Sequence, residues 1–511
     1  MTFMRIDNSD SRVSIRKYLF LLPLFITAAF CIYSPVLHHF FVSDDFKVLF
    51  RVCIEKIIFV PGFFRPLSDL TIYANYITGG LNPVWFNSFN ILIHGVNSYV
   101  LFLFCFRLAV SRDRSKAFYF AILASVFFIC YPFHNETIVW ILGRGSGMAC
   151  LFALTGLLCY YYISNSGLKI LLSCICYFIS IAAFESTIIF PLIMLMVLLI
   201  ENQDHATKCK WTFALALTFF FHLIFRYLLS GSILGSYGNA FFHSDAKRYI
   251  LNIAKTGGRL ILPPSNNAIW LTWVFVLLML ISVICIVKNF NHIRENSSLR
   301  NLAVLSAMLG IANIVPIVVG VSTQTSESDR LLYFPSVFVC MIWSFLIVFI
   351  VSSLALKRIL IFLTIAYNLI FLELNNLNWR KASFITSSII EKINDRKRAG
   401  DAGRLFFLNI PNEIQGAYVF RLGFADALKL YGADSTQFIP VNYLQRNDLE
   451  KIKEKIILNT SDTEIVLPPH VLLKRIANGN YQIFENGKLK YTSSAGDEIY
   501  YWDTKQLELI P

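Results

Sequence analysis

The sequence contains little charge. Only 15% of its 511 residues are Asp, Glu, Lys or Arg, whereas a soluble domain averages about 25%. Hydrophobic residues make up 56%, and the mean hydropathy is +0.59. This composition excludes an ordinary soluble enzyme, and an aromatic share of 15% excludes a disordered chain. We therefore expect the chain to lie in a bilayer.

The 11 cysteines show no pattern of a disulfide framework or a zinc site. None follows Cys340, and most lie in apolar runs, where a thiol behaves as a small hydrophobic group. The net charge of +13 could attract nucleic acid, but the excess of basic residues lies in loops between apolar runs. No nucleic-acid partner is therefore expected.

Apolar runs that are long enough, or nearly so, to cross about 30 Å of hydrocarbon recur through the first three quarters of the chain. We expect eleven transmembrane spans, near residues 18–38, 88–107, 117–133, 146–163, 168–184, 186–200, 211–230, 267–288, 301–320, 331–353 and 358–375. The first run is too long for a signal peptide and lacks a small-residue cleavage site, so it is interpreted as an anchor.

Basic residues gather in alternate connections between these runs. They are Arg5, Arg12, Arg16 and Lys17, then Arg107, Arg112, Arg114 and Lys116, then Lys208 and Lys210, then Lys288, Arg294 and Arg300, and finally Lys357 and Arg358. By the positive-inside rule they mark the cytoplasmic face. An odd number of spans then places the tail on the opposite side.

The other connections contain carboxylates. These are Asp44, Asp45, Asp69, Glu136, Glu185, Asp245, Glu327 and Asp329. A carboxylate at the end of a membrane helix costs a few kcal/mol if it faces lipid, so we expect a shared wet cavity on the non-cytoplasmic side. The simpler alternative is loop acids in headgroup water. Most span centres are uncharged, and snorkelling is the simplest explanation for the exceptions, His222 and Arg226.

The connection at 39–87 begins with an acidic pair, Asp44 and Asp45. Adjacent side chains point about 100° apart on a helix, so the two carboxyl groups are not expected to share one proton. One carboxylate could take a proton from an acceptor hydroxyl while the other orients it or binds a sugar. The same residues also fit an ordinary helix N-terminus capped by Ser43. Residues 67–78 predict an interfacial helix.

From about residue 376 the charged residues become denser and the long apolar runs stop. RLFFLNI, TQFIPV and TEIVLP predict strands, GAYVFRLGFADALKLYG and DLEKIKEKIIL predict helices, and Asn486-Gly487 predicts a hairpin. The expected fold is an α-helical polytopic membrane domain over 1–375 with a small α/β extracytoplasmic domain over 376–511. This second domain is expected to shape acceptor binding or to hold a partner.

Four segments in order resemble the GT-C superfamily of polytopic glycosyltransferases, especially its protein O-mannosyltransferase-like branch, in which some members carry tetratricopeptide repeats. They are FVSDDF, FRPLSDLTIYANYITGGLNPVWFNSFNILIHGVNS, YPFHNETIVWILGRGSGM and SESDRLLYFPS. The resemblance covers residues 18 to about 375. The chain has no 34-residue repeat, and Ser146 stands where relatives often have an acidic residue.

The resemblance implies sugar transfer from a polyprenyl-phosphate donor to a hydroxyl of a glycan, lipid or protein acceptor, on the non-cytoplasmic face. Asp44, or else Asp45, would deprotonate the acceptor in a single displacement that inverts the anomeric configuration. Arg65, Arg144 and Arg330 lie at the same predicted edge, where a guanidinium can hold the donor phosphate with two hydrogen bonds.

His134 and Glu136 stand two residues apart and could hold sugar hydroxyls, position the base or form a divalent-cation site, which would need about six oxygen ligands. Sugar binding is preferred, and the resemblance adds His94 to the substrate site. Glu185, one of the carboxylates of the expected wet cavity, is also assigned to it. Each has a simpler alternative. His94 could be a helix-packing residue, Glu185 a helix N-terminal charge, and Arg330 a surface ion pair with a neighbouring acid.

Two other functions remain open, a flippase or exporter of lipid-linked glycans and a non-catalytic membrane assembly protein. The sequon that begins at Asn135 lies in the expected active site, where a glycan would obstruct catalysis. This favours a bacterial inner membrane, with the N-terminus cytoplasmic, the tail periplasmic and undecaprenyl phosphate as the carrier.

Overall fold

The computed structural model describes residues 15–62, 64–110, 113–233, 246–265, 297–449, 464–467, 470–476, 478–503 and 506–510, with single positions between 269 and 280. The chain divides into two compact units. The helical unit comprises Met1–Leu37 and Ile58–Asn376. The tail unit comprises His38–Ile57 and Leu377–Pro511. The segment that contains Asp44 and Asp45 is thus grouped with the C-terminal region rather than with the membrane helices.

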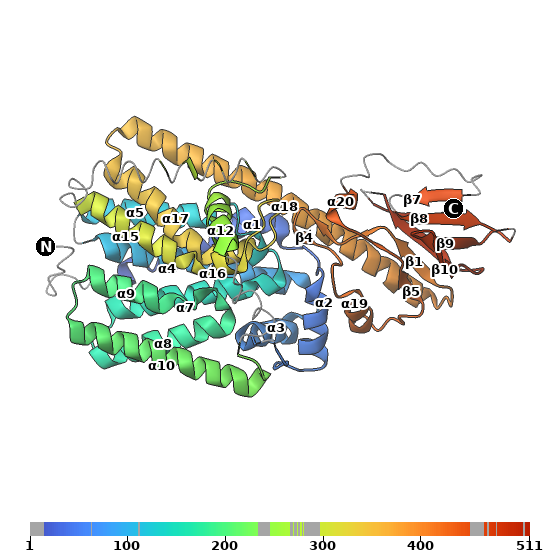
Figure 1. The fold of residues 1–511 in the computed structure, drawn as a ribbon, viewed down its shortest axis with the longest axis horizontal. Coiled ribbons are helices and arrows are strands. Elements are labelled where there is room, and N and C mark those ends of the chain that lie inside the picture. Colours follow the sequence, from blue (N-terminus) through green and yellow to red (C-terminus); the bar gives the residue numbers. More distant parts are fainter. Residues whose placement is uncertain are drawn as a thin grey trace. The chain divides into compact units, whose positions relative to one another are not determined.

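The helical unit is a bundle of α-helices (Figure 1). Its α-helices are α1 (Leu21–Tyr33), α3 (Pro66–Gly79), α4 (Pro83–Ala109), α5 (Arg114–Ile129), α6 (Asn135–Ile138), α7 (Arg144–Tyr162), α8 (Ser166–Ala183), α9 (Phe190–Ile200), α10 (His205–Ser230), α12 (Ala246–Arg259), α15 (Ser297–Ala312), α16 (Ile314–Val319), α17 (Tyr333–Phe345) and the first part of α18 (Leu354–Ala399). Short 3-10 turns are η1 (Ile15–Tyr18), η2 (Ser34–Val36), η4 (Ile141–Gly143), η5 (Glu185–Thr187) and η7 (Asp329–Leu332), and η8 (Leu346–Ile350) is a π-turn.

Several helices begin at a polar side chain that satisfies otherwise unpaired backbone N–H groups. The Oδ1 atom of Asp113 accepts hydrogen bonds from Ser115 N and Lys116 N at 2.9 and 3.1 Å. Asn82, Asn165 and Asp204 cap α4, α8 and α10 in the same way. These caps fix where each helix begins.

Among the described residues, six helices are long and apolar enough to cross a membrane, namely Pro83–Ala109, Ile141–Tyr162, Ser166–Ala183, His205–Ser230, Asp329–Ile350 and Leu354–Ala399. Three shorter apolar helices cover Leu21–Val36, Glu185–Ile200 and Arg300–Ala312. The expected span at 117–133 coincides with the 16-residue helix α5. The expected span at 267–288 lies almost entirely outside the described residues, and the count of eleven stays a prediction.

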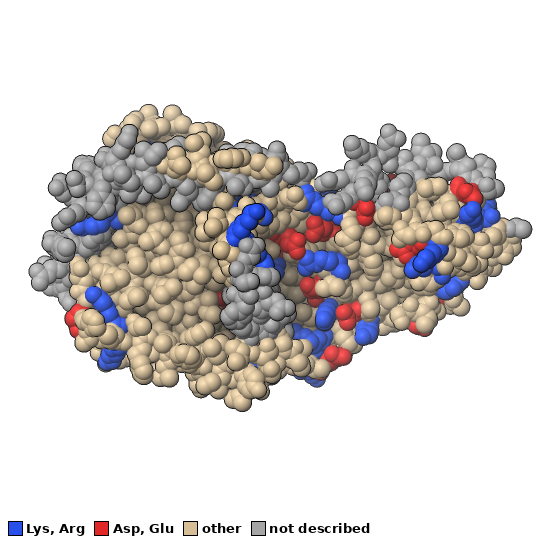
Figure 2. Space-filling model, viewed as in Figure 1, with Lys and Arg blue, Asp and Glu red and all other residues tan. Residues whose placement is uncertain are grey.

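The helices differ in how much of their surface the protein covers. In α4 and α7, 78% of the most apolar window is buried, against 17% in α10 and 6% in α18. Helix α4 packs against α1, α5 and α7, while α7 packs on α8 and α8 on α10. In Figure 2, blue and red atoms are sparse over the tan surface of the helical unit. Helices α4 and α7 thus form the interior of the bundle, whereas the apolar windows of α10 and of the first part of α18 are mostly exposed.

The tail unit combines the second part of α18 with short helices and two larger sheets. Its helices are α2 (Asp44–Leu49), the π-turn η3 (Phe50–Ile54), α19 (Phe424–Leu430) and α20 (Arg446–Leu449). Its strands are β1 (Leu405–Leu408), β2 (Ile410–Pro411), β3 (Glu413–Ile414), β4 (Ala417–Tyr418), β5 (Phe438–Pro440), β6 (Tyr443–Leu444), β7 (Glu464–Leu467), β8 (Val471–Arg475), β9 (Tyr481–Glu485), β10 (Lys488–Thr492), β11 (Glu498–Trp502) and β12 (Leu507–Leu509).

One sheet has the strand order β12-β11-β1-β5, with β1 parallel to both β11 and β5, and the other is the antiparallel meander β10-β9-β8-β7. Side chains from both sheets form one hydrophobic core that includes Phe406, Leu473, Ile483 and Tyr501. The predicted hairpin at Asn486-Gly487 is confirmed, and it joins β9 to β10.

Two expectations for the tail need correction or lie outside the described residues. The helix predicted over 416–432 begins only at Phe424, because β4 pairs with β3 and Gly423 adopts a left-handed φ of 88°. Most of the helix predicted from Asp448 onward lies outside the described residues.

Helix α18 has 46 residues and does not end near 376. At a rise of 1.5 Å per residue it is roughly 70 Å long, more than twice the bilayer core.

Candidate functional site

A buried ion pair joins two connections of the helical unit that lie 194 residues apart. The Arg330 guanidinium pairs with Glu136 Oε1, and the Arg330 backbone N–H donates to Glu136 Oε2 at 2.9 Å. The guanidinium carbon lies 5.2 Å from the Trp140 ring centroid, within range of a cation–π interaction. The Glu136 side chain is fully buried while that of Arg330 is 16% exposed. Arg330 is therefore the accessible member of the pair.

A second carboxylate, that of Glu185, receives two guanidinium groups. Arg65 Nη2 lies 3.2 Å from Glu185 Oε2, and Arg226 Nη1 lies 3.1 Å from Glu185 Oε1. Sequence analysis explained Arg226 by snorkelling, but its side chain is only 6% exposed and is held in this ion pair. The Glu185 carboxylate thus joins the connection that contains Arg65 to helix α10.

Glu185 and Arg330 line the same pocket. Its lining residues are Phe184, Glu185, Ser186, Val315, Val319, Ser328, Arg330 and Leu331. The pocket lies between η5, α16 and η7, so it brings residues 184–186 together with residues 315–331. We call it the polar pocket. A guanidinium can bind an anionic group there, and the carboxylate and serine hydroxyls can bind sugar hydroxyls.

A fully buried ion pair supports one wall of the polar pocket. Arg259 Nη2 donates to both carboxylate oxygens of Asp329, at 2.6 and 2.8 Å, and neither side chain is more than 1% exposed. Arg259 also donates to the backbone oxygens of Ser322 and Leu262, at 3.1 and 2.7 Å. Asp329 thus pairs with Arg259, while its sequence neighbour Arg330 pairs with Glu136. Sequence analysis did not single out Arg259.

His94 and His134 lie together, with ring centroids 5.2 Å apart. His94 Nδ1 is 2.8 Å from Tyr333 Oη and Nε2 is 3.0 Å from the Ile129 oxygen, so both ring nitrogens have partners. His134 Nε2 is 2.7 Å from Ser336 Oγ. Burial, and then the neighbouring His94, lower the pKa of His134 well below its usual 6.5. These contacts favour the packing interpretation of His94, and His134 is neutral at pH 7.

Arg144 begins α7 and is 1% exposed. Its Nη1 donates to Asn75 Oδ1 at 2.8 Å, and its guanidinium lies over the Phe89 ring at 4.9 Å. These contacts tie α7 to α3 and α4. Arg144 is not among the residues that line the polar pocket.

Asn135, the first residue of the sequon, is 1% exposed, and its amide donates to Asn376 Oδ1. The folded protein therefore offers this side chain no room for a glycan.

Asp44 and Asp45 belong to the tail unit, where they form the first turn of α2. Asp45 is 1% exposed and its Oδ2 accepts a hydrogen bond from Val42 N at 3.0 Å, while Asp44 is half-buried. Asp44 and Asp45 do begin a helix, as the simpler interpretation expected. The Ser43 side chain, however, accepts no capping hydrogen bond from that helix. Its hydroxyl oxygen instead accepts from Leu422 N at 3.3 Å.

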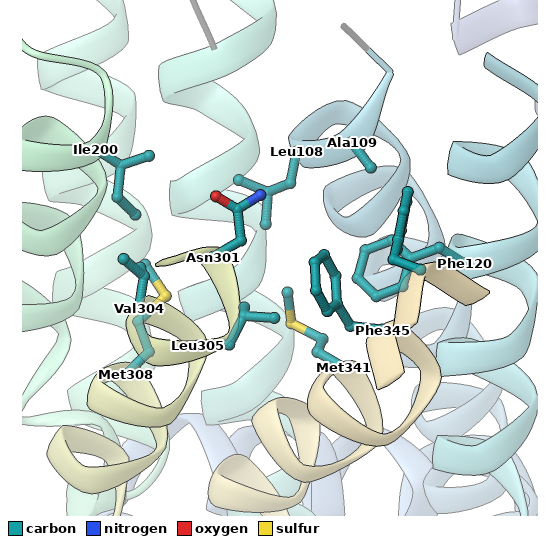
Figure 3. A pocket seen from close by; sticks show the side chains of 11 residues that line it. Leu108, Ala109, Phe120, Ile200, Asn301, Val304, Leu305, Met308, Met341 and Phe345 are labelled. Atoms are coloured by element: carbon teal, nitrogen blue, oxygen red, sulfur yellow. The ribbon is translucent and has the colours of Figure 1, made fainter. Parts of the chain in front are cut away.

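A second pocket of the helical unit is almost wholly apolar. It is lined by Leu108, Ala109, Phe120, Ile200, Asn301, Val304, Leu305, Met308, Met341, Phe345 and Phe349. Figure 3 shows side chains from several helices of the bundle converging on this space, with Asn301 as the one polar group among those labelled. We call it the apolar pocket. It contains no acid or base for catalysis, and the polar pocket is the better candidate site.

Within the described part of the chain, no group of three or more His, Cys, Asp or Glu side chains is arranged to hold a metal ion. The polar pocket has one carboxylate in its lining, against the about six oxygen ligands that a divalent cation prefers. The arrangement favours anion and sugar binding.

The helical unit contains apolar helices long enough to span a bilayer, and its polar pocket has Glu185 and Arg330 in its lining, each of which takes part in an ion pair. Over one segment the chain is similar to curated mannosyltransferases. It is 36% identical over 97 residues to Protein O-mannosyl-transferase TMTC1 of Homo sapiens, covering 19% of this chain and 10% of that protein. It is 37% identical over 98 residues to Protein O-mannosyl-transferase TMTC2 of Mus musculus, covering 19% and 11%.

Protein O-mannosyl-transferase TMTC3 of Homo sapiens is 31% identical over 97 residues, which cover 19% of this chain and 10% of that protein. The matched segment thus spans about a tenth of the length of these relatives. No family model matches the chain, and no solved structure matches it.

Proposed function

We propose that this protein is a membrane glycosyltransferase that transfers a hexose, with mannose the first candidate, from a polyprenyl-phosphate donor to an acceptor hydroxyl. The polar pocket carries the proposal, because it combines an accessible guanidinium with a carboxylate and hydroxyl groups. The similarity to proteins named O-mannosyl-transferases supports the class of reaction and the choice of sugar. The acceptor class, whether glycan, lipid or protein, is left open.

In this reaction the bond between the anomeric carbon and the phosphate oxygen breaks, and its electron pair leaves with the lipid phosphate. The phosphate needs a positive charge beside it as the bond breaks. Arg330 is suited to this role because the buried Glu136 orients its guanidinium while its side chain keeps some exposure. A guanidinium can hold two phosphate oxygens through parallel hydrogen bonds.

The triad of Arg65, Glu185 and Arg226 supplies the second part of the donor site. Glu185 itself lines the polar pocket, and it is bound by both guanidinium groups. In the proposal Glu185 accepts hydrogen bonds from sugar hydroxyls while the two arginines hold it in place. His134 and Arg144 are buried outside the lining of the polar pocket, and in the proposal they support the helices around it, with His94 packed against His134.

The acceptor oxygen forms the new bond to the anomeric carbon, and its proton passes to a carboxylate of the first connection. Asp44 is proposed as this base, because it is half-buried whereas Asp45 is buried and engaged by Val42 N. In this scheme Asp45 holds the first turn of α2 in place through its hydrogen bond from Val42 N. One displacement inverts the anomeric configuration.

The proposal places the reaction on the non-cytoplasmic face of the membrane. A bacterial inner membrane with undecaprenyl phosphate as the carrier is the first setting to test, and dolichyl phosphate in the endoplasmic reticulum is the second.

The test uses the full chain in lipid nanodiscs with mannose linked to undecaprenyl or dolichyl phosphate. Release of polyprenyl phosphate and mass labelling of added membrane acceptors are followed for Asp44→Asn and Asp45→Asn. Asp44→Asn should lower transfer at least about 1000-fold, because the amide cannot take up the proton. Asp45→Asn should lower it less.

Asp113→Asn is the matched control, because Asp113 is 43% exposed and caps α5, and Asn caps a helix equally well. It should transfer at the original rate. Undiminished transfer by both Asp44→Asn and Asp45→Asn would refute the proposed base. A flippase would move the donor across a vesicle membrane without consuming it.

A further inference from the structure

The backbone immediately before the acidic pair adopts an unusual conformation. Ser43 has φ 46° and ψ −119°, in a region that residues with a side chain rarely occupy. Such a conformation persists only where the surrounding structure holds it, and it is often found at functional sites. The conformation of Ser43 sets the direction in which α2 begins, and with it the placement of Asp44 and Asp45.

The contacts that hold Ser43 come from the tail, almost 380 residues later in the sequence. The Ser43 backbone N–H donates to the Val419 oxygen at 2.7 Å. The Ser43 hydroxyl oxygen accepts from Leu422 N at 3.3 Å. One helical turn further on, the Phe46 ring stacks on the Phe420 ring with a centroid separation of 5.6 Å. All of these residues lie in the tail unit.

Gly423 permits this close approach. Its φ is 88°, and an added Cβ would overlap the Ser43 carbonyl oxygen and lie 3.1 Å from the Ser43 carbonyl carbon. Two independent requirements therefore favour glycine here, the left-handed backbone and the absence of a side chain. Helix α19 begins at the next residue and packs on α2.

We propose that residues 417–424 form a clamp that positions Asp44 and Asp45 for catalysis, with Gly423 as the positioning residue that lets the clamp close on Ser43. The inference rests on the proposed function, in which one of these aspartates is the base. It assigns the tail unit a direct part in building the active site. The sequence had suggested an accessory domain that shapes acceptor binding or holds a partner.

The decisive comparison is Gly423→Ala against Gly479→Ala. Both glycines have a left-handed φ, 88° and 83°, but nothing lies within 4 Å of a Cβ added at Gly479. Both variants thus bear the same backbone strain, and only Gly423→Ala pushes against Ser43. Two readouts are made on the full chain in nanodiscs, hydrogen exchange of peptides covering 43–50 and donor consumption with polyprenyl-phosphate mannose.

Gly423→Ala should speed exchange in 43–50 at least about tenfold, because the Ser43 N–H loses its acceptor. It should lower kcat about 100-fold and leave the KM for the donor within a factor of two. Gly479→Ala should change neither readout. Equal behaviour of the two variants would overturn the clamp.

A second pair keeps the test valid if Gly423→Ala fails to fold. Phe420→Leu removes the stacking on Phe46, whereas Ile483→Ala weakens the core between the two sheets and serves as the control for general destabilisation of the tail unit. Phe420→Leu should speed exchange in 43–50 more than Ile483→Ala does. The reverse order would count against the clamp.

Exchange and activity also separate this inference from the proposed function. If Gly423→Ala alone loosens residues 43–50 while the unaltered chain consumes no donor, the clamp stands and the proposed function falls. If the unaltered chain is active and Gly423→Ala affects neither readout, the proposed function stands and the clamp falls.

Discussion

The polar pocket and the apolar pocket of the helical unit are both built between helices, but they differ in the charge of the residues that line them. The apolar pocket has Asn301 as the one polar residue in its lining and is bounded by side chains such as Leu305 and Phe345. The polar pocket has Glu185 and Arg330 in its lining. Leu108 and Ala109 of the apolar pocket adjoin the basic cluster expected on the cytoplasmic face. The contrast separates a charged pocket beside η5 and η7 from an uncharged pocket beside the end of α4.

The two pockets are also held together by different forces. Around the polar pocket, ion pairs join segments 194, 120 and 70 residues apart in the sequence. The apolar pocket depends on the packing of hydrocarbon side chains, which is non-directional and tolerates substitutions that conserve volume. Removal of one charged residue near the polar pocket should therefore lower stability far more than a volume-conserving substitution in the lining of the apolar pocket.

The largest effect on stability is expected at the buried pair behind the polar pocket. Arg259→Ala should lower the free energy of unfolding by about 3–5 kcal/mol, because it leaves Asp329 buried and without its guanidinium partner. Unfolding of the detergent-solubilised protein by denaturant measures this change. The double variant Arg259→Met with Asp329→Leu should recover most of the loss, since it removes both charges. Lys116→Ala, at an exposed position, should change unfolding by less than about 0.5 kcal/mol.

A smaller effect, on ligand binding, is expected at the polar pocket itself. Arg330→Ala should weaken binding of polyprenyl-phosphate mannose about 100-fold, the scale of a lost charge-assisted interaction. Arg330→Lys should recover only part of it, because an ammonium lacks the planar two-pronged geometry. Equilibrium binding with a radiolabelled donor measures both variants.

Asn301→Leu, in the apolar pocket, is the matched control and should bind the donor as the original protein does. If this variant weakened binding as much as Arg330→Ala, the distinction between the pockets would be wrong.

The smallest effect concerns pH. Burial lowers the pKa of His134 well below 6.5 in the folded protein, so the unfolded chain takes up this proton more readily. The contribution of His134 to stability is thus fully present above about pH 6.5 and declines as the pH falls below it. His134→Gln should remove this part of the acid sensitivity, as measured by the melting temperature between about pH 5 and 8.

Between about pH 7 and 8, the affinity for the donor should depend on pH in the same way in His134→Gln and in the original chain. The reason is that the His134 imidazole is neutral throughout that range. A difference between the two profiles there would show that His134 titrates in the folded protein, contrary to its burial.

Local features of the sequence predicted much of the fold. Long apolar runs become helices because a bilayer requires every backbone polar group to be bonded within its own segment. The Asn486-Gly487 pair becomes a hairpin turn because both residues tolerate positive φ. The helix over 416–432 was predicted too long, because its apolar pattern carries no sign that Ala417–Tyr418 pairs with another strand.

The sequence could predict which residues belong to the candidate site, but it could not predict which of them form ion pairs with one another. Glu136, Glu185 and Arg330 stand out as charges beside apolar runs, yet nothing local links Glu136 to a residue 194 positions away. Arg259 was missed because it ends an amphipathic segment that resembles an ordinary surface helix. The grouping of residues 38–57 with the tail depends on the strained Ser43 and its distant contacts, which leave no trace in a single sequence.

The bond between Ser43 and Val419 also bears on the order of biosynthesis. A ribosome that adds about 5–20 residues per second needs roughly 20–75 seconds to pass from the first of these residues to the second. Throughout that interval the nascent chain has its early membrane helices but lacks the segment that completes the turn before Asp44. Under the proposed function, a truncated or stalled product would therefore lack the clamp, so its premature release would yield no active transferase.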